Sequence, residues 1–149
     1  MKIGVACDHA GFPLKKIVLD AVIECGDLPI DLGTNDETAV DYPDYAEIVG
    51  RLIQTGEADR GIIICGSGVG AGIAANKMKG IYAGVCHDTY SAHQGVEHDD
   101  MNVLSLGARI IGADLAREIV CAFLQARFSQ AERHVIRVEK IRNLETRFH

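Results

Sequence analysis

Short apolar segments alternate along the chain with longer segments in which apolar residues recur at helical spacing. Residues 60–65, RGIIIC, show no alternation of polar and apolar positions, which is typical of a strand buried on both faces of a sheet. Four more segments are short and largely apolar: 2–7, 28–32, 81–86 and 102–107. This alternation predicts one doubly wound, Rossmann-like α/β domain, with a five-stranded parallel sheet, helices on both faces and a C-terminal helix.

Proline, glycine and aspartate mark the ends of the helical segments. Proline is favoured in the first turn of a helix, glycine just after its end, and aspartate as its N-cap. The expected helices run from Pro13 to Gly26, from about Pro43 to Gly56, from the glycine-rich turn after residue 65 to about Lys79, from Asp88 onward, over 113–127 and over 130–146. No repeat, linker or low-complexity segment divides residues 1–149, so we expect a single domain.

The composition limits the classes of protein to which the chain can belong. Apolar residues make up 48% of the chain and charged residues 24%, as in globular proteins. No apolar run is long enough to span a bilayer, and the N-terminus turns polar too soon for a signal peptide, so we expect a cytoplasmic protein without a membrane partner. The net charge of −6 argues against nucleic acid as a partner.

Basic residues are nevertheless concentrated near the C-terminus. They are Arg127, Arg133, His134, Arg137, Lys140, Arg142 and Arg147. A solvated helix face and an anion-binding site are both compatible with this cluster.

The five cysteines show no pairing pattern. Their number is odd and no two have CxxC spacing, so we expect neither a disulfide framework nor a zinc site. Buried thiols usually behave as small apolar groups. Cys65 differs from the others because it ends a buried strand and begins the glycine-rich stretch CGSGVGAG.

That stretch is suited to binding an anion. Glycines let the backbone turn sharply and leave N–H groups open, and the start of a helix adds partial positive charge. In a doubly wound sheet, ligands bind at the carboxyl ends of the strands, where this turn lies. A relaxed dinucleotide fingerprint, GxGxxA, and glycines that serve packing alone are the alternatives; the Gly-Lys-Ser or Gly-Lys-Thr of a P-loop is absent.

Cys65 gives the turn a side chain that can react. A helix N-terminus favours the thiolate, which can act as a base or nucleophile. A thiolate beside a ring of backbone N–H groups suits removal of a proton α to a carbonyl, because the N–H groups stabilise the resulting oxyanion.

Several motifs together resemble the ribose-5-phosphate isomerase B family. They are DHAG (8–11), DLGT (31–34), DYPDYA (41–46), CGSGVGAGIAANK (65–77), EHDDMN (97–102), LGARIIG (106–112) and ERHVIRVEKI (132–141). The resemblance implies interconversion of ribose 5-phosphate and ribulose 5-phosphate through an enediolate, with no metal and no organic cofactor. It also implies a homodimer with active sites between the subunits, a tetramer being the alternative. Allose 6-phosphate, galactose 6-phosphate or a tetrose phosphate are alternative substrates, and a non-catalytic binding module is a third hypothesis.

The resemblance also assigns roles to individual residues. Cys65 resembles the base that moves the proton, and His98, supplied by the partner, resembles the acid/base that opens the sugar ring. The remaining residues resemble those that bind substrate: Asp8, His9 and Tyr42 in the pocket, Gly66, Ser67, Gly68, Val69 and Gly70 in the anion hole, and Arg109, Arg133, His134 and Arg137 around the phosphate.

Asp99 departs from the asparagine common in the family after the motif histidine. A carboxylate accepts hydrogen bonds, whereas an amide also donates them. We therefore expect Asp99 to point away, to orient His98 or to contact a sugar hydroxyl, and to influence the choice of sugar.

Overall fold

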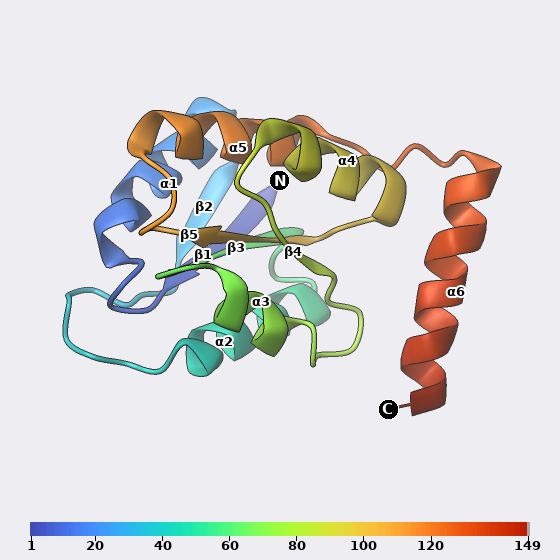
Figure 1. The fold of residues 1–149 in the computed structure, drawn as a ribbon, viewed down its shortest axis with the longest axis horizontal. Helices are drawn as coiled ribbons and strands as arrows, with labels where there is room; N and C mark the ends of the chain where they lie inside the picture. The colour runs from blue at the N-terminus through green and yellow to red at the C-terminus, as the bar shows by residue number, and fades with distance from the viewer. Residues whose placement is uncertain (149) are drawn as a thin grey trace.

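Five parallel strands form one sheet in the order β2-β1-β3-β5-β4 in the computed structural model, which describes residues 1–148 (Figure 1). The strands are β1 (Lys2–Cys7), β2 (Leu28–Asp31), β3 (Arg60–Cys65), β4 (Ala83–Val85) and β5 (Val103–Gly107). The helices are α1 (Phe12–Glu24), α2 (Tyr42–Gln54), α3 (Val69–Ala75), α4 (Thr89–Asp99), α5 (Ala113–Gln125) and α6 (Glu132–Phe148). The predicted fold class is confirmed.

Helices cover both faces of the sheet. Helices α1, α4 and α5 pack on one face, whereas α2 and α3 pack on the other (Figure 1). Because side chains alternate along a strand, β3 directs Ile62 and Ile64 to the first face and Ile63 and Cys65 to the second. The last residue of β3 therefore points toward α2 and α3.

The element boundaries differ from those expected mainly around α3 and β4. Helix α3 ends at Ala75 rather than near Lys79, and β4 covers only 83–85. The Asn76 side chain explains this difference, because its amide donates to the carbonyl of Ala83 at 2.8 Å and its Oδ1 accepts from the Ala83 N–H at 2.7 Å. These bonds end the helix and begin the strand. The N-cap expected at Asp88 is confirmed, since its Oδ1 accepts from Ser91 N–H at 2.7 Å.

Helix α6 stands apart from the sheet and lies beside α4 (Figure 1). Only His134 and Val138 of this helix are buried. The ion pair of Arg142 with Asp100, at 2.9 Å, ties it to the end of α4. No helix among residues 1–148 is both long enough and apolar enough to cross a membrane.

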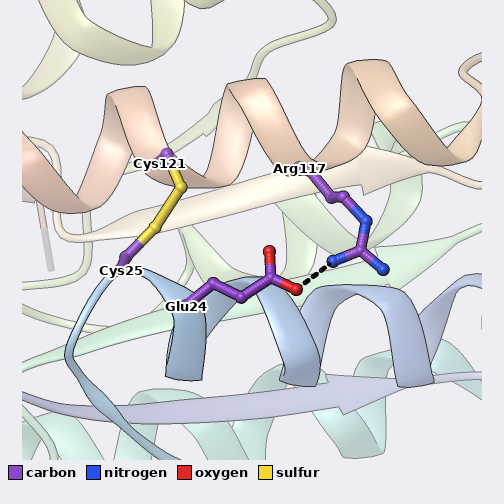
Figure 2. Close-up of a disulfide and its surroundings, with 4 residues drawn as sticks. All are labelled: Glu24, Cys25, Arg117 and Cys121. Carbon is purple, nitrogen blue, oxygen red and sulfur yellow. Dashed lines mark hydrogen bonds and ion pairs between the residues drawn. A yellow bond between two sulfur atoms is a disulfide. The ribbon is translucent and has the colours of Figure 1, made fainter.

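Two cysteines form a disulfide, which the sequence did not lead us to expect. Cys25 directly follows α1, Cys121 lies in α5, and their Cα atoms are 6.0 Å apart (Figure 2). Arg117 Nη1 donates to Glu24 Oε1 at 2.7 Å between the same two helices. The cysteines are 96 residues apart, so pairing depends on the packing of α1 against α5 and leaves no local spacing signal.

Candidate active site

A cleft of about 390 Å³ opens where β1, β3 and β5 end. This volume lies in the range of small-molecule sites. Many of the predicted site residues line it: Asp8, His9, Tyr42, Cys65, Gly66, Ser67, Gly70 and Arg109. The sheet topology brings these residues together because the segments that follow parallel strands meet at one edge.

The thiol of Cys65 lies within this cleft and is held by the turn that follows it. Cys65 is only 4% exposed, and its Sγ accepts a hydrogen bond from the Gly68 N–H at 3.1 Å. Gly68 adopts a left-handed conformation with φ +81°, which glycine tolerates best. The left-handed residue folds the chain back toward the sulfur, so the thiol and the backbone donor meet.

The rest of the turn forms an open wall of the cleft. Ser67 Oγ accepts from the Val69 N–H at 3.3 Å. Gly70 has no side chain, and a Cβ there would lie 2.7 Å from Cζ of Tyr42. The Tyr42 ring can therefore lie directly against the turn and close one side of the cleft.

Helix α3, which follows the turn, has only seven residues. The sequence led us to expect a helix that continues to about Lys79 and whose N-terminus adds partial positive charge to the turn. With so short a helix, the individual N–H groups of the turn are the main donors for an anion.

Asp8 and His9 also line the cleft. The Asp8 carboxylate is buried and its Oδ1 accepts from the Gly11 N–H at 2.9 Å. His9 Nδ1 lies 3.2 Å from both the backbone nitrogen and the carbonyl oxygen of Val40, so the ring is held against the segment that precedes α2. Arg109 lies beside the turn, where its backbone N–H donates to the carbonyl of Gly66 at 3.0 Å.

His98 belongs to a second group of predicted residues, on α4 and α6. Its ring stacks on that of His134, with centroids 4.0 Å apart and planes inclined by 31°. Gln94 Nε2 lies 2.9 Å from His98 Nδ1. Because an amide nitrogen only donates, Nδ1 accepts and the neutral ring carries its proton on Nε2.

His134 is buried and both of its ring nitrogens are engaged. Arg133 Nε donates to Nε2 at 3.1 Å, so Nδ1 carries the proton, and it faces Ser129 Oγ at 2.6 Å. Burial lowers the pKa of His134 below 6.5, and the nearby charges of His98, Arg133 and Arg137 lower it further. Burial and these charges favour the neutral imidazole, which contacts Arg133 and the His98 ring. The assignment of His134 to the phosphate site stays a prediction.

The two groups of site residues do not meet in one chain. Arg133 and Arg137 are exposed on successive turns of α6, and Asp99 is exposed at the end of α4. None of the residues of α4 or α6 lines the cleft around Cys65. Arg109 therefore belongs with Cys65, whereas Arg133 and Arg137 belong with His98.

Sequence reasoning missed two residues that contact these groups, Gln94 and Ser105. Gln94 lies four residues before His98, a spacing that places two side chains on one helix face. Ser105 is the polar residue of the apolar segment VLSLG. In both cases the sequence pattern pointed to the residue, but we made no prediction from it. Within residues 1–148, no cluster of three or more histidine, cysteine or acidic residues is placed to bind a metal ion.

Comparison with known proteins identifies the family to which the chain belongs. The model of the family described as Ribose/Galactose Isomerase matches residues 3–141. Ribose-5-phosphate isomerase B of Escherichia coli (strain K12) is 47% identical over 146 residues, which are 98% of this chain and 97% of that protein. The structure of Clostridium thermocellum ribose-5-phosphate isomerase B has a TM-score of 0.96 at 46% identity and covers 100% of both chains.

A further solved structure contains a sugar phosphate. Ribose-5-phosphate isomerase B of Mycoplasma genitalium, with bound ribulose 5-phosphate, has a TM-score of 0.89 at 37% identity and covers 97% of this chain and 96% of its own. These matches extend over nearly the whole length of the chain and its relatives. The chain belongs to the ribose/galactose isomerase family.

Proposed function

We propose that the chain is a cytoplasmic aldose–ketose isomerase that interconverts D-ribose 5-phosphate and D-ribulose 5-phosphate, a reaction of the pentose phosphate pathway. The observation that carries this proposal is the thiol of Cys65, which lies in a cleft with the Gly68 N–H on its sulfur. The names of the similar proteins from Escherichia coli and Clostridium thermocellum support this substrate.

Cys65 acts as the base in this proposal. Its thiolate removes the proton from C2 of the open-chain aldose, the C–H electrons form a C1–C2 double bond, and negative charge develops on O1. The thiol then returns the proton to C1, while O2 loses its hydroxyl proton and O1 gains one, which gives the ketose. Backbone N–H groups of the turn from Gly66 to Gly70 stabilise the cis-enediolate between these steps.

The ring-opening acid/base comes from a second subunit. His98 does not line the cleft of its own chain, so we assign it to the cleft of a partner in a homodimer. The apolar residues that α6 leaves exposed support such an interface, since patches of this kind mark contacts between proteins. They are Ile136, Ile141, Leu144 and Phe148.

The substrate phosphate is assigned to α6. Arg133 and Arg137 are one turn apart, and guanidinium groups suit the bidentate binding of phosphate. His134 accepts from Arg133 Nε and so fixes one edge of that guanidinium. Phosphate bound here holds the reacting carbons near Cys65 of the other subunit.

A related isomerase with another sugar is the second candidate. The family description names galactose as well as ribose, which supports this alternative. Tyr42 and Ser67 border the cleft, and Asp99 carries a charge where family members commonly have an amide. These residues are the ones we expect to set the length of sugar that fits.

An isomerase assay on ribose 5-phosphate, allose 6-phosphate, galactose 6-phosphate and erythrose 4-phosphate tests both candidates, with Cys65→Ala as the blank. We expect the highest kcat/KM on ribose 5-phosphate and a loss of at least about a hundredfold in Cys65→Ala, as for removal of a general base. A preference for another sugar would support the second candidate. Unchanged turnover in Cys65→Ala would contradict the assignment of the base.

A further inference from the structure

Ser105 places a hydroxyl in the interior beneath the glycine-rich turn. It lies in β5 between Leu104 and Leu106, and it is fully buried. Those leucines face α1 and α5, so alternation along the strand directs Ser105 to the other face, toward α3. There its Oγ donates to the carbonyl oxygen of Gly68 at 2.6 Å.

Gly68 connects this hydroxyl to the candidate base. The N–H of Gly68 donates to Cys65 Sγ at 3.1 Å, while its carbonyl accepts from both Ser105 and the Gly72 N–H, the latter at 3.0 Å. The bond from Gly72 belongs to the first turn of a helix of seven residues. The bond from Ser105 joins Gly68 to the central sheet, so it fixes the orientation of this left-handed residue against a rigid element.

We propose that Ser105 is a positioning residue for Cys65. By holding the Gly68 carbonyl, it keeps the Gly68 N–H directed at the sulfur and keeps the neighbouring N–H groups open toward the cleft. The role rests on the proposed function of Cys65 as the base. It differs from catalysis because the Ser105 hydroxyl touches neither the thiol nor the cleft, but acts through one peptide segment.

The physical effect is on the charged form of the thiol. A hydrogen bond donated to a thiolate stabilises it relative to the thiol. Without the Ser105 hydroxyl, the Gly68 carbonyl keeps only its helical partner, and the residue is free to rotate its N–H away from the sulfur. We therefore expect loss of the hydroxyl to make Cys65 a poorer thiolate while substrate binding is retained.

The test measures the reactivity of the thiol directly. Cys65 is alkylated with iodoacetamide over a range of pH, and the modified cysteine is identified by peptide mass mapping. Burial raises the pKa of Cys7 and of Cys86 to about 11, so these two thiols react slowly, and Cys25 and Cys121 form a disulfide and offer no thiol to alkylate. In Ser105→Ala we expect the midpoint of alkylation to move up by about half a pH unit or more.

A matched pair of variants separates the hydroxyl from the shape of the side chain. Ser105→Thr keeps the hydroxyl, whereas Ser105→Val has nearly the same shape without it. We expect the threonine variant to retain the native alkylation midpoint and the valine variant to shift upward, with kcat on ribose 5-phosphate lowered about tenfold and KM nearly unchanged. The pair remains informative even if Ser105→Ala does not fold.

Thr55→Val is the control for general loss of a hydroxyl, since Thr55 Oγ1 donates to a backbone carbonyl, that of Leu52, at an exposed site. Its alkylation midpoint should not move. Equal midpoints and equal kcat in Ser105→Thr and Ser105→Val would overturn the proposal and leave Ser105 a packing residue. The alkylation result also stands if the native chain does not turn over ribose 5-phosphate, so failure of the proposed function is recognised separately.

Discussion

The rings of His98 and His134 stack across α4 and α6 with their centroids 4.0 Å apart. This contact places the candidate ring-opening acid/base on a buried histidine whose pKa burial holds below its usual value. A protonated His134 would oppose a positive charge on His98 and would lose its bond from Arg133. The protonation state of His134 therefore matters for the stability of the contact between α4 and α6.

Acid should destabilise the fold through His134. Because its pKa in the folded chain is lowered below 6.5, the unfolded chain takes up a proton on this imidazole first as the pH falls. The stabilisation is present above 6.5 and is lost below it. We expect the drop in Tm between about pH 7.5 and about pH 5.5 to be smaller in His134→Gln than in the native chain.

His93→Gln is the matched control, because His93 lies exposed on α4 and pairs with Glu97 at 3.3 Å. It should retain the native dependence of Tm on pH. If His134→Gln has the same dependence as the native chain, the loss of stability in acid comes from other groups.

Two inactive variants should restore activity together if the site is shared between subunits. In a mixed dimer of Cys65→Ala with His98→Ala, one of the two sites contains both native side chains. Random mixing by co-expression should therefore give about a quarter of the native activity. A site formed within one chain would leave every dimer inactive, so the absence of recovery in verified mixed dimers would contradict the shared site.

Arg137→Ala should weaken the binding of phosphate. Hydrogen bonds to charged groups contribute about 1.5 to 3 kcal/mol, which corresponds to a rise in KM of about 10- to 100-fold. Inhibition by inorganic phosphate should weaken in parallel. Lys140→Ala removes one exposed charge from the same helix and should change KM little. Equal effects of the two substitutions would indicate a general loss of positive charge.

The disulfide should stabilise the fold without contributing to turnover. Cys25→Ser is expected to lower the free energy of unfolding by about 2 to 4 kcal/mol, because the link closes a long loop in the unfolded chain. Reductant should lower the Tm of the native chain but not of Cys25→Ser. Arg117→Gln removes the neighbouring half-exposed ion pair and should cost less than about 1 kcal/mol. A native Tm that does not respond to verified reduction would contradict this prediction.

Much of the cleft follows from local sequence. The apolar segment ending at Cys65 and the glycines after it predict a buried strand and an open turn, and strand order alone places Asp8 and Arg109 beside them. The end of α3 was missed because the Asn76 side chain bonds to Ala83. The pairing of Cys25 with Cys121 was missed because it depends on two helices meeting from distant parts of the chain.

Local sequence patterns also could not predict that the site residues form two separate groups within one chain. Arg133 and Arg137 share a helix face, whereas Arg109 follows the last strand, but the sequence alone does not show that they lie in different parts of one chain. Only the position of α6 beside α4 shows that two of these arginines lie away from the cleft. The sequence does show Ser105 as a polar residue within a buried strand. It does not show which group the Ser105 hydroxyl bonds to.

Because side chains alternate along the strands, the free thiol of Cys65 and the disulfide lie on opposite faces of the sheet. Cys65 points to the face covered by α2 and α3, whereas the Cys25–Cys121 link joins α1 and α5 on the other side of the sheet. The sheet keeps the thiol away from the disulfide, and a thiolate must reach a disulfide sulfur to exchange with it. The thiol proposed as the base can thus stay reduced while the Cys25–Cys121 pair is oxidised, because the sheet lies between them.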